Sequence, residues 1–163
     1  MARLFFACVL VCVILIQATV LPGLHLIGVL PDLVLVLLLV WSAMRGIGEG
    51  VVWVFVAGLL LDVLAMDRLG TNGLALLVVA VLAGQARRRF FHSGMVFPIA
   101  LAIVATVVHA SVLLLLRGSE GMALSVGPAF RLIFLQALLN SLLVPPLYLL
   151  VGWMDRWVVQ SHA

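Results

Sequence analysis

The sequence predicts an all-α, polytopic membrane protein with six transmembrane helices. Of its 163 residues, 66% are hydrophobic and 9% are charged, and its mean hydropathy is +1.38. A water-soluble domain needs a polar surface that so few charged side chains cannot supply. Long apolar runs also lack the alternating polarity of transmembrane barrel strands. We expect a single six-helix domain over residues 1–163, because the connections are too short to fold outside the membrane.

Six apolar runs define the expected helices, and short clusters of glycine, proline, charge or asparagine separate them. The first run has 18 residues and no convincing cleavage site for a secretory signal, so we interpret it as a retained span. The runs are Leu4–Leu21, Leu26–Met44, Val51–Met66, Gly73–Ala86, Met95–Leu116 and Ala129–Trp153.

The second run contains Pro31 and Asp32 directly before the uninterrupted apolar stretch Leu33–Trp41. Proline is favoured at the first helical position and an acid suits the first turn, so we expect this helix to begin at Pro31. From Pro31 to Met44 such a helix rises only about 20 Å, which is less than the ~30 Å hydrocarbon core. We therefore expect Leu24–Leu30 to enter the membrane as a separate, tilted or irregular piece.

The connections and the last helix carry further signals. Gly46 and Gly50 favour a tight turn before the third run and allow close helix approach. The fourth run ends at the arginine triplet Arg87–Arg89. In the sixth run, Pro145-Pro146 removes two backbone donors, so this helix is expected to kink or break.

The arginines predict the orientation, because basic residues are enriched in short cytoplasmic connections. All nine cationic residues are arginine, and an inside N-terminus places six of them in the cytoplasm and three outside. We therefore expect both termini in the cytoplasm. For the arginine triplet, a role as a topology anchor is favoured over a specific contact with a partner. The inner set is Arg3, Arg45, Arg87, Arg88, Arg89 and Arg156, and the outer set is Arg68, Arg117 and Arg131.

Four polar residues are expected at similar depth in the outer half of the membrane. Asp62 and His109 lie about 17 Å and 20 Å along their helices from the inner end, and Gln136 lies about 10 Å from the outer end of its helix. Asp32 belongs to the same layer. Polar groups are costly in lipid, so the layer favours an interhelical hydrogen-bond cluster, while a bound ligand or a partner helix stays open. Asn140 is expected to form a packing hydrogen bond.

Signals for an enzyme, a metal site or a cofactor site are weak. An intramembrane aspartyl hydrolase would pair Asp32 with Asp62, but their surroundings do not resemble a lipoprotein signal peptidase. Cys8 and Cys12 are spaced i, i+4 and match neither a zinc nor a redox pattern, so we interpret them as helix-packing residues. No cofactor is expected. No basic block exceeds the arginine triplet, so nucleic acid is not an expected partner.

Several short motifs occur in a characteristic order along the chain. They are Leu30-Pro31-Asp32-Leu33-Val34-Leu35, Arg45-Gly46 with Glu49-Gly50, Ala57-Gly58-Leu59-Leu60-Leu61-Asp62-Val63-Leu64, Leu69-Gly70, Ala83-Gly84 before Arg87–Arg89, and Pro145-Pro146. Together with the length and the six runs, they resemble the bacterial rod shape-determining protein MreD family over nearly the whole chain. The segments Leu24–Leu30 and Arg117–Gly127 show nothing that matches the family.

The resemblance implies a non-enzymatic membrane scaffold of the cell-elongation complex, which builds the peptidoglycan side wall at the bacterial inner membrane. It implies MreC as the first partner, with the actin-like MreB, the polymerase RodA and its transpeptidase in the same machinery. It also implies a fold similar to the membrane substrate-binding subunits of energy-coupling-factor transporters. A small-molecule-binding subunit of a vitamin-type transporter is the alternative function, and whether the complex contains two copies of this chain stays open.

Partner binding is expected inside the bilayer, because the connections are too short to reach far outside it. Small residues allow the closest helix approach, so Gly58, Gly84 and Ala80 are candidate docking positions, although they are equally suited to packing within the bundle. The inner surface around Arg45 and Arg87–Arg89 is expected to add electrostatic attachment to a partner or to membrane lipid. The other residues with an expected structural or partner-binding role are Pro31, Asp32, Asp62, His109 and Gln136.

Overall fold

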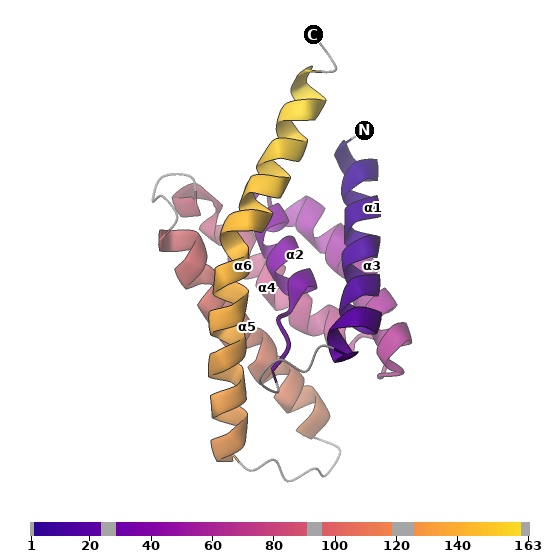
Figure 1. Cartoon of the computed structure of the whole chain (residues 1–163), viewed down its shortest axis with the longest axis vertical. Helices are drawn as coiled ribbons and strands as arrows, with labels where there is room; N and C mark the ends of the chain where they lie inside the picture. The colour runs from indigo at the N-terminus through magenta and orange to yellow at the C-terminus, as the bar shows by residue number, and fades with distance from the viewer. Residues whose placement is uncertain (1, 24–28, 91–95, 119–125, 161–163) are drawn as a thin grey trace.

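The computed structural model describes residues 2–23, 29–90, 96–118 and 126–160. Within these ranges the regular secondary structure is helical, with no strand, and each expected run overlaps one α-helix (Figure 1). The all-α class is therefore confirmed. The elements are α1 (Ala2–Leu15), the π-helix η1 (Ile16–Val20), the 3-10 turn η2 (Leu21–Gly23), α2 (Leu33–Arg45), α3 (Ile47–Ala65), α4 (Thr71–Phe90), α5 (Val96–Gly118) and α6 (Val126–Gln160).

The length and composition of the helices identify a membrane protein. Among the described residues, four helical segments are long and apolar enough to cross a bilayer, namely Arg3–Val20, Ile47–Ala65, Val96–Leu116 and Phe130–Trp153. Two further apolar helices, Leu33–Arg45 and Thr71–Arg87, are shorter. Length and composition thus support four crossings, and the six crossings and the similarity to energy-coupling-factor subunits stay predictions.

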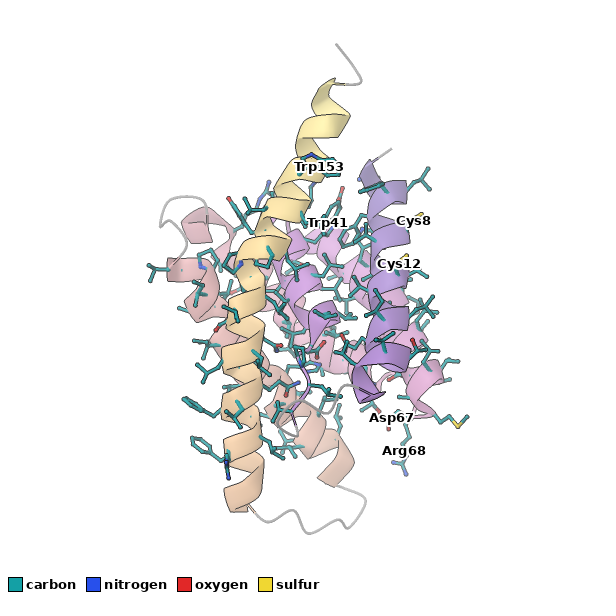
Figure 2. The ribbon with its side chains drawn as sticks, in the orientation of Figure 1. Cys8, Cys12, Trp41, Asp67, Arg68 and Trp153 are labelled. Carbon is teal, nitrogen blue, oxygen red and sulfur yellow. The ribbon has the colours of Figure 1, made fainter. Side chains whose placement is uncertain are left out.

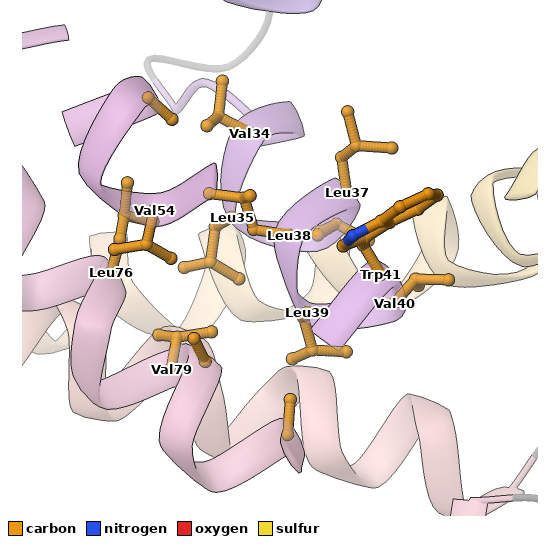
Figure 3. Packing of buried hydrophobic residues seen from close by; sticks show 14 of the residues in the cluster. Val34, Leu35, Leu37, Leu38, Leu39, Val40, Trp41, Val54, Leu76 and Val79 are labelled. Carbon is orange, nitrogen blue, oxygen red and sulfur yellow. The ribbon is translucent and has the colours of Figure 1, made fainter. Parts of the chain in front are cut away.

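Helix α2 lies at the centre of the bundle. It contacts α1, α3, α4, α5 and α6, and every side chain from Val34 to Ala43 is buried. Figure 3 shows its leucines and valines packed with Val54 of α3 and with Leu76 and Val79 of α4. Because other helices surround α2, its side chains meet apolar neighbours on every side, in agreement with the uninterrupted apolar stretch in the sequence.

The start of α2 differs from the expectation. The helix begins at Leu33, and Asp32 is its N-cap, with a non-helical backbone at φ −98° and ψ 86°. Pro31 therefore lies outside the helix, and the prediction that it occupies the first helical position is wrong. Asp32 caps the helix from a non-helical conformation, and Pro31 comes before this cap. Residues 29–32 form no helix, in agreement with an irregular entry, and residues 24–28 lie outside the described part.

Helix α1 packs on the core through one stripe of large side chains. The stripe consists of Phe6, Leu10 and Ile14. The Phe6 ring stacks on Trp41 of α2, with ring centroids 3.7 Å apart. Cys8 and Cys12 are exposed on the outer side of α1, so their expected packing role is wrong (Figure 2). Each lies two residues from the stripe, about 200° around the helix.

Helix α6 runs for 35 residues with Pro145 and Pro146 inside it. The expected break is absent, and the C-terminal part of the helix leans away from the axis of the N-terminal part (Figure 1). A bend is the milder response to the loss of backbone donors at proline. At 1.5 Å per residue, α6 is about 52 Å long, which exceeds the thickness of a hydrocarbon core.

The two ends of the bundle differ in charge and in the elements they contain. At the end that holds the start of α1, the Arg3 guanidinium pairs with Glu49 at 2.6 Å, and Arg87 lies against Gly46 of the α2–α3 turn. We call this the Arg3 end. The α3–α4 turn, which carries Asp67 and Arg68, lies at the opposite end, which we call the Asp67 end (Figure 2). The C-terminal end of α6 lies at the Arg3 end (Figure 1).

Candidate functional site

Asp32 is the centre of a buried polar cluster. One carboxylate oxygen, Oδ1, accepts hydrogen bonds from Gln17 Nε2 and from the Leu35 backbone N, both at 3.0 Å. The Asp32 backbone N donates to Asn140 Oδ1 at 2.7 Å. The other carboxylate oxygen, Oδ2, faces His109 Nδ1 at 3.7 Å. The side chains of Asp32 and His109 are about nine-tenths buried.

Two further contacts extend this cluster into neighbouring helices. Gln17 Oε1 accepts from the Val34 backbone N at 2.9 Å, so Gln17 and Asp32 together satisfy donors at the start of α2. Asn140 Nδ2 donates to Thr106 Oγ1 at 3.0 Å, which links α6 to α5. The expected packing role of Asn140 is confirmed. The cluster thus joins η1, α2, α5 and α6 through hydrogen bonds that lipid could not replace.

Asp62 serves the next helix along the chain. Its side chain is fully buried, and Oδ2 accepts from the Gly70 backbone N at 2.5 Å. Oδ1 accepts from the backbone N and the Nδ2 of Asn72 at 2.9 Å and 2.8 Å. Met66 ends α3 in the left-handed region at φ 53°, which reverses the chain direction. A carboxylate of α3 therefore caps α4 and closes the α3–α4 hairpin.

A polar cleft lies between these two hydrogen-bonded groups. Its volume is about 330 Å³. Residues from η1, α3, α4 and α5 and the N-cap of α2 line it, namely Gln17, Ala18, Asp32, Leu61, Leu64, Ala65, Asn72 and His109. The cleft is where the hydrogen-bond network of Asp62 meets the Asp32 cluster, through Asn72.

An apolar groove runs along the outside of α3 and α4. It has a volume of about 240 Å³ and is lined by apolar side chains and by two glycines near the start of α4, Gly70 and Gly73. Gly73 lies here because α3 and α4 approach closely at Gly58. A Cβ on Gly58 would stand 2.3 Å from the Gly73 Cα. The remaining lining residues are Val51, Val54, Phe55, Leu59, Leu74 and Leu77.

The small residues that were candidate docking positions face other helices of the same chain. Gly58 meets Gly73, and a Cβ on Gly84 would stand 2.8 Å from the Ile47 Cβ. Ala80 is fully buried. These positions therefore agree with packing within the bundle, which was the alternative to partner docking, because small residues permit such close helix approach.

The arginines of the Arg3 end are held in different ways. The Arg45 guanidinium lies 5.3 Å from the centre of the Trp41 ring, a cation–π contact. Arg87 is exposed beside the α2–α3 turn. Arg88 and Arg89 belong to α4, and their side chains lie outside the described ones.

The expected layer of four polar residues is assembled only in part. The structure brings Asp32 and His109 together, while Asp62 forms its own network and reaches the cleft only through Asn72. Gln136 is half-buried and, among the described residues, makes no hydrogen bond to the cluster. It lies about 6 Å beyond Asn140 along α6, and Asn140 occupies the level of Asp32.

Three polar partners were missed by the sequence analysis, which assigned no role to Gln17, Asn72 or Thr106. Gln17 lies inside the first apolar run. Asn72 lies two residues after Gly70, in the Thr-Asn-Gly segment that starts α4. A polar side chain inside an apolar run is the signal that could have identified them. Their partners lie 10 to 34 residues away, which no local pattern reveals.

The hydrogen bonds of the two intramembrane acids favour helix capping over acid–base chemistry. Each carboxylate accepts donors from the first turn of a helix, Asp32 for α2 and Asp62 for α4. Among the described residues the two share no hydrogen bond, which an aspartyl dyad with one shared proton would require.

Comparison with known families decides the identity of this capped bundle. The family described as the rod shape-determining protein MreD matches residues 1–153. The chain belongs to the MreD family. The match confirms the resemblance drawn from the motifs. As a member of the MreD family, the chain has a role in rod shape determination. No match is found among curated proteins or among solved structures.

Three motifs that carry the MreD resemblance have visible structural roles in this chain. In Pro31-Asp32, the acid is the N-cap of the central helix and the proline precedes it. Asp62, at the end of the Gly58–Asp62 segment, accepts a hydrogen bond from the Gly70 backbone N. The two motifs thus hold the α3–α4 hairpin together.

Proposed function

We propose that this MreD-family chain is a non-enzymatic scaffold subunit of the cell-elongation complex, which builds the peptidoglycan side wall of rod-shaped bacteria. The observation that carries the proposal is the family match over residues 1–153. The bundle of short connections and long apolar helices supports a protein that works through contacts within the inner membrane.

The proposal includes six crossings with both termini in the cytoplasm. Helix α4 has 20 residues and is about 30 Å long, and α2 reaches the Asp67 end with the help of the non-helical residues 29–32. Arg3, Arg45 and Arg87 gather at the Arg3 end, whereas Arg68 lies at the Asp67 end. The positive-inside rule then favours the Arg3 end as cytoplasmic.

MreC is the proposed direct partner, and its transmembrane helix is proposed to dock in the apolar groove. Lipid chains and leucine are equally apolar, so helices associate in a bilayer through close packing more than through hydrophobicity. The groove offers such packing, because Gly70 and Gly73, which have no side chains, line it together with exposed apolar side chains such as Phe55 and Leu74.

The Arg3 end is proposed to orient the complex at the cytoplasmic surface. Arg87 is exposed there, where it can interact with acidic groups of a partner or of anionic lipid. MreB, RodA and its transpeptidase are assigned to the same machinery, with MreC as the link.

Co-purification with MreC tests the proposal. Leu74→Trp fills the groove, and Leu142→Trp is the matched control, because Leu142 is an exposed leucine on α6. We expect Leu74→Trp to reduce recovery of MreC at least fivefold and Leu142→Trp to leave it unchanged. Exchange of the MreC transmembrane helix for an unrelated apolar helix should abolish recovery, and deletion of its periplasmic domain should not.

The opposite pattern would overturn the docking proposal. If recovery survives helix exchange but is lost with the periplasmic domain, the contact lies outside the membrane. If the purified set of partners is an ATPase pair, the transporter alternative replaces the scaffold function.

A further inference from the structure

With the insertion proposed above, the polar cleft lies close to the membrane surface at the Asp67 end. Of its lining residues, Leu61, Leu64 and Ala65 belong to the last turns of α3, and Asn72 is the second residue of α4. Asp62, which holds Asn72, lies about 5 Å below the end of α3. Leu64 and Ala65 are exposed, so the rim of the cleft on α3 is open to the surroundings. A group from the interfacial region can therefore reach the cleft.

Two side-chain oxygens among the residues that line the cleft accept no hydrogen bond from the described residues, namely Asp32 Oδ2 and Asn72 Oδ1. Asp32 uses Oδ1 for Gln17 and Leu35, whereas Oδ2 has His109 Nδ1 at 3.7 Å, which is longer than a hydrogen bond. Asn72 donates a hydrogen bond from Nδ2 to Asp62. Its amide oxygen, Oδ1, points away from this bond and accepts no hydrogen bond from a described residue. An ionised carboxylate cannot donate, so the cleft offers acceptors for a ligand that brings donors.

The carboxylate of Asp32 is also held in place for binding. It caps α2, whose N-terminal dipole stabilises negative charge, and the Gln17 amide fixes it from the side. Gln17 is held in turn by the π-helical turn Ile16–Val20, and such turns are frequent at functional sites. Because the side chain is nine-tenths buried, its attraction for a cation is screened less than it would be in water.

We propose that the polar cleft binds a primary ammonium group through Asp32 Oδ2 and Asn72 Oδ1, with the apolar wall of Leu61 and Leu64 covering the attached carbon chain. An ammonium group carries three donors and one positive charge, which match these acceptors. A volume of about 330 Å³ suits a small headgroup or a short alkylamine. The same chemistry occurs in the headgroup of phosphatidylethanolamine and in free amines.

The test uses the purified full-length chain in detergent. Hexylamine is compared with hexanol by the shift in thermal unfolding, and native mass spectrometry compares phosphatidylethanolamine with phosphatidylcholine of the same acyl chains. We expect hexylamine to raise the unfolding temperature more than hexanol does, or the ethanolamine lipid to bind at least tenfold more tightly than the choline lipid. A response to the amine alone identifies a free amine as the source, and a response to the lipid alone identifies the headgroup.

Two variants assign this binding to the cleft. Asp32→Asn keeps a capping side chain and removes the charge, and its control is Glu49→Gln, which removes a carboxylate at the opposite end. Ala65→Phe fills the cleft without changing Asp32, and its control is Val63→Phe on the exposed side of α3. Each cleft variant should reduce the affinity at least tenfold, and each control should retain it.

The proposal fails if hexylamine acts like hexanol and the two lipids bind equally. It also fails if the folded Ala65→Phe variant binds the probe with the affinity of the original chain. If Asp32→Asn does not fold, the binding measurement on Ala65→Phe tests the proposal. The measurement uses the isolated chain, so its result is independent of whether MreC binds the apolar groove.

Discussion

At the scale of single residues, the two intramembrane acids do similar structural work at different helices. Asp32 caps α2, and Asp62 caps α4 from the preceding helix. Within a bilayer the first backbone donors of a helix find no water, so each needs an acceptor from the protein. A carboxylate supplies several acceptor positions in a single side chain, which explains why these costly residues serve the starts of two helices.

We predict that Asp62→Asn is tolerated better than Asp62→Leu. Asparagine keeps one acceptor oxygen, whereas leucine leaves the donors of Gly70 and Asn72 unpaired. We expect a loss of about 1–2 kcal/mol of stability for the asparagine variant and at least about 3 kcal/mol for the leucine variant. Thermal unfolding in detergent measures the difference. Equal losses of shape-determining function in both variants, with normal folding and assembly, would indicate chemistry at this carboxylate.

At the scale of secondary-structure elements, side chains or their absence set the distances between helices. Glycine brings α3 and α4 into backbone contact at Gly58 and Gly73, and stacked rings hold α1 against α2. The two arrangements respond differently to substitution, because the first is disturbed by added atoms and the second by lost atoms.

The glycine contact predicts a steep cost for one added methyl group. In Gly58→Ala, the new Cβ would meet backbone atoms of Gly73, so α3 and α4 must separate. We expect a loss of about 2 kcal/mol of stability. Gly48→Ala on the same helix is the control, because a Cβ there meets nothing within 4 Å and should cause no loss. A tolerated Gly58→Ala would contradict this packing of the hairpin.

The aromatic contact predicts an asymmetry between two adjacent phenylalanines of α1. Phe6 is fully buried against Trp41, whereas Phe5 is about half exposed. We expect Phe6→Ala to lower stability by about 3 kcal/mol, through the cavity it leaves, and Phe5→Ala to have little effect. Limited proteolysis of the N-terminal helix, together with thermal unfolding, distinguishes the two. Similar effects at both positions would mean that α1 does not pack through the Phe6 stripe.

At the scale of the whole molecule, the charged residues distinguish the two ends of the bundle. The start of α1, the α2–α3 turn and the C-terminal part of α4 meet at the Arg3 end, with Arg3 and Arg87 among them. Short connections with excess arginine stay on the cytoplasmic side, so this asymmetry predicts how the bundle is inserted.

Cysteine accessibility tests the insertion. In a background of Cys8→Ser and Cys12→Ser, Arg68→Cys should react with a membrane-impermeant maleimide added to intact spheroplasts. Gly48→Cys, which lies at the Arg3 end, should react only after permeabilisation. Reaction of residue 48 from the outside would reverse the proposed orientation.

From the amino-acid sequence alone we could predict the membrane class, the approximate position of each helix and the presence of polar residues at the start of α2. These properties follow from local composition, because a long apolar run in water has few alternatives to burial in lipid. The sequence also indicated the irregular entry before α2, since a helix from Pro31 to Met44 is too short to cross the membrane alone.

The tertiary structure alone decided which polar residues meet and which helix forms the core. Lipid tails are as apolar as leucine, so a hydrophobic pattern cannot separate a buried helix such as α2 from one that faces lipid. For the same reason, Cys8 and Gly58 could not be assigned to the outside and the inside of the bundle. The pairing of Asp32 with Gln17 and of Asp62 with Gly70 depends on helix rotation and depth, which only packing within the bundle specifies.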